Sequence, residues 1–219
     1  MAKHTMQSIT AEGLSKSFGR LKVIDDLDLQ LFSGDIATIH GRNGSGKTTL
    51  LSMLSTLTLP DKGHLRYCRD GLAINDDLIS RTIGYMSHKT FLYQSLTVLE
   101  NLEFFAELYS IRDVKLVIEE KSRVLNVQDQ LHKRVTTLSH GQRKRISIIR
   151  SLLHSPAILI MDEPETGLDQ ESVSLLRNFI ISFAETGGIA VIASHTSEVD
   201  YGEDQKRYHI SNGRLLKGS

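Results

Sequence analysis

The 219-residue sequence has no tryptophan, three prolines and one cysteine. A single thiol, Cys68, cannot form an internal disulfide and gives no thiolate zinc site, so disulfide scaffolds and zinc modules are not expected. The 26 lysine and arginine residues equal the aspartate and glutamate residues in number, so the formal net charge is zero. A chain-wide basic surface is therefore absent, and we expect no nucleic-acid partner.

Long hydrophobic runs are also absent. Nothing approaches the ~20 consecutive apolar residues that span a bilayer, and the richest stretch, residues 146–161, is interrupted by Arg150, His154 and Ser155. With 40% hydrophobic and 24% charged residues, the composition is that of an ordinary globular domain. We therefore expect one domain over residues 1–219 that is cytoplasmic and reaches the membrane face only through another polypeptide.

Apolar periodicity predicts a mixed α/β chain. Residues 27–31 alternate between leucine and polar residues, as in a half-buried strand, and residues 98–109 carry one apolar helical stripe. Further strands are expected at 36–40, 63–68, 82–86, 157–161 and 188–193, a terminal hairpin at 207–216, and helices at 47–55, 114–125, 142–153 and 170–185. We expect residues 1–89 and 151–219 to form an α/β core, and residues 90–150 a helical subdomain.

Residues 41–48 read G-R-N-G-S-G-K-T, a full match to the phosphate-binding pattern G-x-x-x-x-G-K-[ST], between an expected strand and an expected helix. The glycines let successive backbone N–H groups face one point, and the helix N-terminus adds partial positive charge. Lys47 can neutralise phosphate oxygens, and the Thr48 hydroxyl is placed to bind Mg²⁺. The candidate nucleotide-binding residues are Gly41, Arg42, Asn43, Gly44, Ser45, Gly46, Lys47 and Thr48.

A second candidate element is the apolar run 158–161, which ends in Asp162 and Glu163. Two acidic side chains at the end of a buried strand can bind the metal of a metal-bound triphosphate and activate water beside it. Asp162 would hold the Mg²⁺, and Glu163 could polarise a water molecule as general base. The alternative is a strand followed by a solvated acidic turn, but the P-loop earlier in the chain favours the catalytic interpretation.

Two weaker signals complete the set. Residues 138–142, L-S-H-G-Q, precede a helix, so Ser139 can cap that helix and exposed N–H groups can form a second anion site. A plain capped helix is the simpler interpretation of so short a motif. His195 follows an apolar strand and can hydrogen-bond a γ-phosphate, although a lone histidine is usually only a satisfied polar residue. Their order after the P-loop favours the functional interpretation of both.

In this order the motifs resemble the nucleotide-binding domain of the ATP-binding-cassette (ABC) family over nearly the whole chain. The resemblance implies a P-loop NTPase core with a RecA-like mixed sheet, an N-terminal antiparallel β subdomain and an α-helical insert. It also implies a homodimer that encloses two ATP molecules and works with ABC transmembrane permease subunits. The implied residues are Phe18 stacked on adenine with Val23 beneath it, the Walker A loop extended to Thr49, the Walker B pair Asp162 and Glu163, the signature residues Ser139, His140, Gly141 and Gln142 acting on the partner's nucleotide, the D-loop Asp169 at the subunit boundary, and the switch residue His195.

The sequence departs from the common ABC pattern at two positions. His140 takes the place of a signature glycine, and His88 takes the place of the Q-loop glutamine, which helps to hold Mg²⁺ and water and senses the transmembrane partner. Contact of the signature with phosphate is still expected, and His88 is kept as a candidate catalytic residue. The run 83–109, with E-T-G-L-D after the acidic strand, is similar to the ATP-binding subunit of the cytochrome c biogenesis haem exporter.

Together the motifs predict an ATPase that drives transport against separate membrane subunits, in haem export or as an ABC-2-type exporter of drugs, lipids or polysaccharides. Three other interpretations remain open. A non-transport ABC ATPase acting on nucleic acid or ribosomes usually has paired cassettes or a long coiled coil, and neither is present in these 219 residues. A small-molecule kinase does not need the L-S-H-G-Q motif, and a binding-only subunit is opposed by Glu163.

Overall fold

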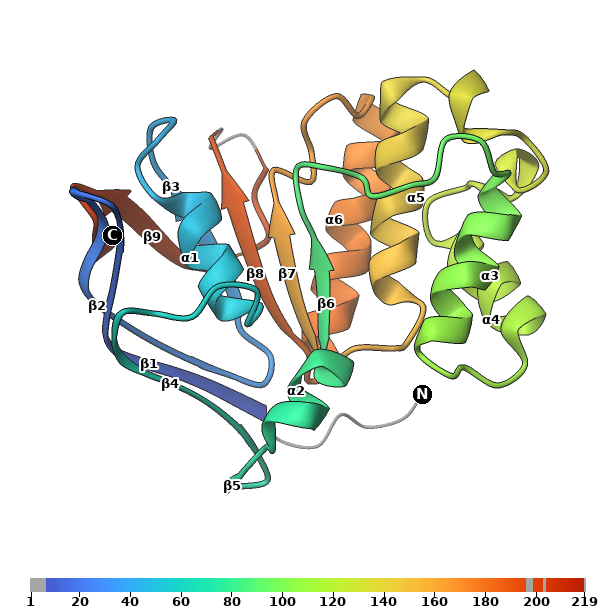
Figure 1. Ribbon diagram of the computed structural model, residues 1–219. Helices are drawn as coiled ribbons and strands as arrows, with labels where there is room; N and C mark the ends of the chain where they lie inside the picture. The colour runs from blue at the N-terminus through green and yellow to red at the C-terminus, as the bar shows by residue number, and fades with distance from the viewer. Residues whose placement is uncertain (1–6, 196–198, 203, 219) are drawn as a thin grey trace.

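The computed structural model describes residues 7–195, 199–202 and 204–218 as two β-sheets with helices on both faces of the larger one (Figure 1). The strands are β1 (Gln7–Phe18), β2 (Leu21–Phe32), β3 (Ile36–His40), β4 (Lys62–Arg69), β5 (Leu72–Ala73), β6 (Ile83–Met86), β7 (Ile158–Asp162), β8 (Ile189–Ser194), β9 (Lys206–Ser211) and β10 (Arg214–Lys217). The helices are α1 (Lys47–Leu54), α2 (Asp76–Thr82), α3 (Val98–Leu108), α4 (Val114–Arg123), α5 (His140–Leu152) and α6 (Gln170–Glu185), with short 3₁₀ turns η1 (Gln128–Gln130) and η2 (Val135–Thr137).

The larger sheet has six strands in the order β10-β9-β3-β8-β7-β6. The neighbours from β9 to β6 run parallel, and β10 pairs antiparallel with β9 in the hairpin that the sequence predicted. The smaller sheet is antiparallel throughout, in the order β2-β1-β4-β5. The predicted fold class, a mixed sheet with an N-terminal antiparallel β section, is confirmed.

Alternate residues of the central strands supply two separate cores. In β7, Ile158 and Ile160 pack with α1 and the smaller sheet, whereas Leu159 and Met161 pack with α3, α4, α5 and α6. A strand that is buried on both faces needs the continuous apolar run seen here. Figure 1 shows the resulting layers, with α1 on one side of the larger sheet and α5 and α6 on the other.

Helices α3, α4 and α5 pack against one another beside the larger sheet (Figure 1). A capping box between Thr97 and Glu100 starts α3 just ahead of its apolar stripe. Neither these nor the other helices in the described ranges are long and apolar enough to cross a bilayer. We propose that residues 90–150 act as a helical subdomain, with the end of α5 anchored against β6.

The segment before β6 differs from the expectation. Residues 76–82 form helix α2, so the strand that was expected at 82–86 begins at Ile83. Ile79 is buried in this helix, but its neighbour Leu78 is exposed. A helix of seven residues with one buried apolar side chain has no stripe that periodicity could detect.

The parallel register brings four loops to one edge of the larger sheet. His40, the last residue of β3, lies beside Ser194 at the end of β8, and Asp162 at the end of β7 lies beside Ala193. Strand β6 pairs in parallel with β7, so the segment that follows β6 leaves from the same edge. Ligand sites in open α/β sheets form at this carboxyl edge.

Candidate nucleotide site

The carboxyl edge of the larger sheet contains a cavity of about 270 Å³. Four separate segments line it, namely the phosphate loop with the start of α1, the loop after β6, the end of β7 and the residue after β8. The lining residues are Asn43, Thr48, His88, Asp162, Glu163 and His195. All six were candidates from the sequence, so the fold brings motifs that are distant along the chain into one polar cavity.

Two glycines of the phosphate loop, Gly41 and Gly46, lie too close to neighbouring atoms to carry a side chain. Gly46 has φ 108°, and a Cβ there would lie 2.9 Å from a side-chain carbon of β2, while a Cβ on Gly41 would lie 2.7 Å from the carbonyl oxygen of Ile210. Nζ of the buried Lys47 donates to the carbonyl oxygens of Gly41 at 2.7 Å and Arg42 at 3.3 Å. The ammonium is therefore held within the loop that would surround a phosphate.

Thr48 and Asp162 join the loop to the acidic strand end. The Thr48 hydroxyl donates to Oδ2 of Asp162 at 2.8 Å. Burial raises the pKa of Asp162, the bond from Thr48 lowers it, and the adjacent Glu163 raises it further. His88 and Lys47 oppose the rise by their charges. This carboxylate is thus costly to ionise unless donors or a cation share the cavity.

The residues present suit Mg²⁺ bound together with a nucleotide. Mg²⁺ prefers oxygen ligands and usually takes one or two carboxylates with substrate phosphates and water. Asp162 offers a carboxylate and Thr48 a hydroxyl, joined at 2.8 Å in one cavity. In the described ranges, no group of three or more His, Cys, Asp or Glu side chains could hold a metal by itself. Thr48 and Asp162 could therefore hold Mg²⁺ when phosphate oxygens complete its shell.

Glu163 has an unusual backbone conformation. Its φ is 50°, in the left-handed region that residues with a Cβ adopt rarely. Its N–H donates to the carbonyl oxygen of Ala193 at 2.8 Å, which holds it against the end of β8. The side chain points toward His195, whose Nδ1 lies 3.4 Å from Oε1 of Glu163. The two residues proposed to handle water and γ-phosphate are therefore close enough to act together.

The signature residues lie at the start of α5 and do not line this cavity. Ser139 is the N-cap, as the sequence predicted, and it forms a capping box with Gln142. A Cβ on Gly141 would lie 2.8 Å from the carbonyl oxygen of Gly167, and a Cβ on Gly167 would lie 2.8 Å from Nδ1 of His140. The signature turn therefore packs against the loop after β7 within the same chain.

The remaining candidates from the sequence have separate positions. Phe18 ends β1 with 55% of its surface exposed, and Nζ of Lys16 lies 5.8 Å from its ring centre. Val23 lines a second cavity of about 260 Å³ beside the phosphate loop, together with residues 42–45. Asp169 caps α6 by accepting from the N–H of Ser172 at 2.8 Å. Hydrogen bonds from the side chain of Ser172 and from its backbone N–H lower the pKa of Asp169.

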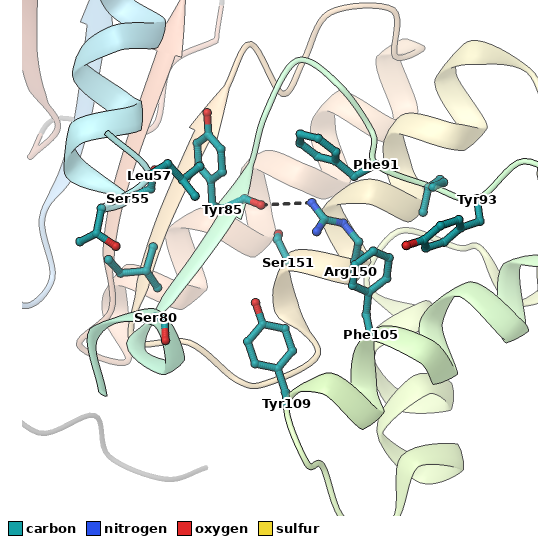
Figure 2. Close-up of a pocket in the computed structure, with 13 residues that line it drawn as sticks. Ser55, Leu57, Ser80, Tyr85, Phe91, Tyr93, Phe105, Tyr109, Arg150 and Ser151 are labelled. Atoms are coloured by element: carbon teal, nitrogen blue, oxygen red, sulfur yellow. Dashed lines mark hydrogen bonds between the residues drawn. The ribbon is translucent and has the colours of Figure 1, made fainter. Parts of the chain in front are cut away.

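A larger groove of about 630 Å³ lies beyond the loop after β6, between the larger sheet and α3 (Figure 2). Figure 2 shows Phe91, Phe105 and Tyr109 around Arg150, which donates to the carbonyl oxygen of Tyr85 at 3.3 Å. The guanidinium carbon of Arg150 lies 4.9 Å from the ring centre of Phe105 and 5.9 Å from that of Phe91. The groove is therefore aromatic and organised around one cation.

Sequence reasoning did not assign a role to Lys144, Arg150 or Glu165. Lys144 is buried and donates to the backbone of Glu163, and the carboxylate of Glu165 accepts from the hydroxyl of Ser194. For Lys144 a signal existed, because it lies four and seven residues before two buried positions of the same helix, Ile148 and Ser151. A charged residue on a buried helical stripe needs a polar partner in the interior.

Comparison with known proteins identifies the family. A family model described as ABC transporter matches residues 24–166. The ABC transporter ATP-binding protein NatA of Bacillus subtilis is 33% identical over 181 residues, which are 81% of this chain and 74% of NatA. The bacitracin transport ATP-binding protein BcrA of Bacillus licheniformis is 35% identical over 211 residues, 95% of this chain and 68% of BcrA.

Solved structures agree on the fold. A structure of the ATP binding subunit of an ABC transporter superposes with a TM-score of 0.84 at 22% identity, covering 96% of this chain and 89% of that one. A bacterial ABC transporter cassette solved as a dimer gives a TM-score of 0.81 at 23% identity, covering 95% of this chain and 98% of that one. At this identity the likeness concerns the fold alone.

The fold and the cavity define a nucleotide-binding cassette, with a phosphate loop, an acidic strand end and a capped signature helix on an ABC-type scaffold. The family match covers more than half of the described chain. The chain belongs to the ABC transporter family, as an ATP-binding subunit. Its predicted assignment as an ATPase is confirmed at the level of that family.

Proposed function

We propose that this chain binds MgATP in the 270 Å³ cavity, hydrolyses it in a dimer of cassettes, and so drives export through separate permease subunits at the cytoplasmic face of a membrane. The observation that supports this most strongly is the convergence of Thr48, Asp162, Glu163 and His195 in one cavity. A solvated acidic turn would not place a buried carboxylate on the hydroxyl of a phosphate loop.

The side chains divide the chemistry between them. Lys47 would turn from its carbonyl partners to β- and γ-phosphate oxygens, and Asp162 with Thr48 would hold Mg²⁺. When bound, Mg²⁺ neutralises charge on the phosphates. Glu163 would accept a proton from the attacking water, and His195, 3.4 Å away, would orient that carboxylate and donate to the γ-phosphate. His88 lines the same cavity and would bind water there.

We further propose that the second anion site acts on the nucleotide of a partner cassette. Ser139 to Gln142 lie outside the cavity of their own chain, so a second copy is needed to bring them to a phosphate. Asp169, which caps α6 after the loop that packs on His140, would then lie at the subunit boundary. Val23, which lines the cavity beside the phosphate loop, would contact adenine there, and Phe18 would stack on the same base.

Glu163→Gln tests the proposed base and the dimer together. The variant should bind ATP, hydrolyse it at least about a hundredfold more slowly and accumulate dimers, because the interface persists while the triphosphate is intact. Sedimentation with and without MgATP measures the dimer, and phosphate release measures the rate. Monomers only, at concentrations that saturate ATP binding, would refute the dimeric arrangement.

Mixing two inactive variants tests whether the signature acts in trans. A Lys47→Ala chain and a Ser139→Glu chain should each be inactive alone. A mixed dimer contains one site with native Lys47 from one chain and native Ser139 from the other, so turnover should reappear on mixing. If both residues served the same site of one chain, no mixed dimer would contain an intact site and the mixture would stay inactive.

The relatives support export of natural products or drugs as the transport class. BcrA is named for bacitracin transport, and a relative from Rhizobium sp. (strain N33), 31% identical over 87% of this chain, is named for Nod factor export. Haem export for cytochrome c biogenesis is the second candidate, and residues 83–109 are the observation that favours it. Neighbouring reading frames decide between them: cytochrome-maturation membrane proteins favour haem export, and drug-export permeases favour the first class.

The aromatic groove is our proposed contact for the permease. Leu57 and Phe91 are 66% and 56% exposed at its rim, which is unusual for large apolar side chains in one place. Phe91 is three residues from His88, so a permease segment in the groove would adjoin the nucleotide cavity. Phe91→Glu should abolish co-purification with the membrane subunits, whereas Leu72→Glu, at an exposed leucine on β5, should not. Equal recovery with both variants would refute this contact.

A further inference from the structure

Lys144 is a charged residue in the interior of the cassette. It belongs to α5, five residues after the N-cap Ser139, or ~7.5 Å along the helix axis. Only 3% of its surface is exposed. Its Nζ donates a hydrogen bond to the backbone carbonyl oxygen of Glu163, at the end of β7. Burying a charged side chain is costly unless it is paired or hydrogen-bonded. The role of Lys144 is therefore best sought at Glu163, the residue whose carbonyl oxygen it contacts.

The backbone of Glu163 is held from both sides. Its N–H donates to Ala193 at 2.8 Å, and its carbonyl oxygen accepts from Lys144 and, at 3.3 Å, from the N–H of Thr166. These bonds hold a φ of 50° that a residue with a Cβ does not adopt readily. Because the Cβ direction follows from the backbone, the same bonds aim the carboxylate at His195. Of these three hydrogen bonds, two join backbone groups and the third comes from the side chain of Lys144.

Nearby carboxylates partly offset the cost of burying a cation at this position. Burial lowers the pKa of Lys144, while the nearby carboxylates of Glu165, Glu163 and Asp162 act in the opposite direction. The charges of three acids thus favour the ammonium form of Lys144, against the effect of burial. With an apolar side chain of the same length at position 144, the carbonyl oxygen of Glu163 would keep only the weaker of its two donors, the N–H of Thr166 at 3.3 Å.

We propose that Lys144 is a positioning residue for Glu163, which ties the helix headed by Ser139 to the backbone of the general base. The proposal rests on the assignment of Glu163 as base in the proposed function. Lys144 does not line the nucleotide cavity, so it would act through Glu163 and not by contact with the nucleotide. Its removal should therefore slow hydrolysis and leave ATP binding intact.

A double-mutant cycle in the full chain tests this. Lys144→Met keeps the length of the side chain and removes the donor; it should lower kcat about ten- to a hundredfold, with the KM for ATP within about twofold of native. In a Glu163→Gln background, the same change should alter the residual single-turnover rate by less than about twofold, because its effect passes through Glu163. Lys115→Met, the same substitution at an exposed position of α4, is the matched control and should leave both rates unchanged.

Two results would overturn the proposal. A native kcat in Lys144→Met would show that the bond is dispensable, and an equal loss in the native and Glu163→Gln backgrounds would show that Lys144 acts independently of Glu163. If Lys144→Met does not fold, Lys144→Leu, which also removes the donor, takes its place in the cycle with the same criteria. A Glu163→Gln variant as active as the native chain would instead refute the base assignment itself, which separates that failure from a failure of Lys144.

Discussion

Replacing Thr48 by valine removes one hydroxyl and keeps the shape of the side chain, so it isolates the bond between the phosphate loop and the acidic strand end. That bond is 2.8 Å long and ends on a carboxylate whose residue is 2% exposed. Hydrogen bonds to charged groups contribute about 1.5–3 kcal/mol, and since Thr48 itself is exposed we expect a loss of roughly 1–2 kcal/mol in the free energy of unfolding. In a chain of this size that corresponds to a fall in Tm of about 2–8 °C.

The loss should depend on pH with a defined sign. The Thr48 bond is strongest to the ionised carboxylate, and burial places the pKa of Asp162 above its ordinary value of 3.8. As the pH falls through this raised pKa the carboxyl group is protonated, the bond becomes a neutral one, and the difference between native and variant should shrink. Urea denaturation of both proteins at neutral and at acidic pH measures this. A stability difference that is the same at both pH values would refute the reasoning.

The same variant shows whether Thr48 affects ATP binding through the metal or by direct contact with the nucleotide. With Mg²⁺, the Kd for ATP should rise about tenfold, because one proposed ligand of the metal is lost. With EDTA in place of Mg²⁺, Thr48→Val should bind ATP within about twofold of native. Thr137→Val, which removes an exposed hydroxyl that donates to Arg134 at 2.8 Å, is the matched control and should change neither Kd. Equal weakening with and without Mg²⁺ would show that Thr48 contacts the nucleotide directly.

Three further predictions use other residues. Lys47→Ala should weaken ATP binding about ten- to a hundredfold and abolish phosphate release, and normal turnover would contradict the phosphate-loop assignment. His88→Gln should retain turnover, whereas a complete loss in the same assay would show that this histidine has chemistry of its own. Burial lowers the pKa of His154 in the folded chain below 6.5. As the pH falls below 6.5, this histidine is protonated in the unfolded chain while it stays neutral in the folded one, so the free energy of unfolding should decrease. His154→Phe, which keeps the stacking on Tyr109, should show a smaller fall in Tm over that range.

The nucleotide cavity could be predicted from the sequence because its residues are the ends of strands. The apolar run 158–161 predicts a strand buried on both faces, and parallel pairing then brings Asp162 to the edge where the phosphate loop leaves β3. The same argument places His195, directly after β8, at that edge. Local patterns and one topological rule are therefore enough for this part of the site.

Other features depend on contacts between distant segments, and no local pattern contains them. The helical spacing of Lys144 indicates that it is buried, but no local pattern shows that its ammonium group meets the carbonyl oxygen of Glu163, 19 residues further along the chain. The left-handed backbone of Glu163 is equally invisible, because glycine or asparagine is the usual signal for it. His140 reads as a departure from a motif, and only the folded chain shows its ring against Gly167.

The capping box at the start of α5 explains how a short motif can serve structure and phosphate binding at once. Oγ of Ser139 accepts from the N–H of Gln142 at 3.2 Å, and Oε1 of Gln142 accepts from the N–H of Ser139 at 3.0 Å. Both side chains thus use acceptors within the helix, and in the described part of the chain the hydroxyl proton and the amide NH₂ are left to donate outward. Donors held rigidly at a helix N-terminus suit an anion and do not suit a cation. The cap therefore orients the donors that a partner's γ-phosphate would need, and a Ser139→Ala variant should lose binding in trans in addition to helix stability.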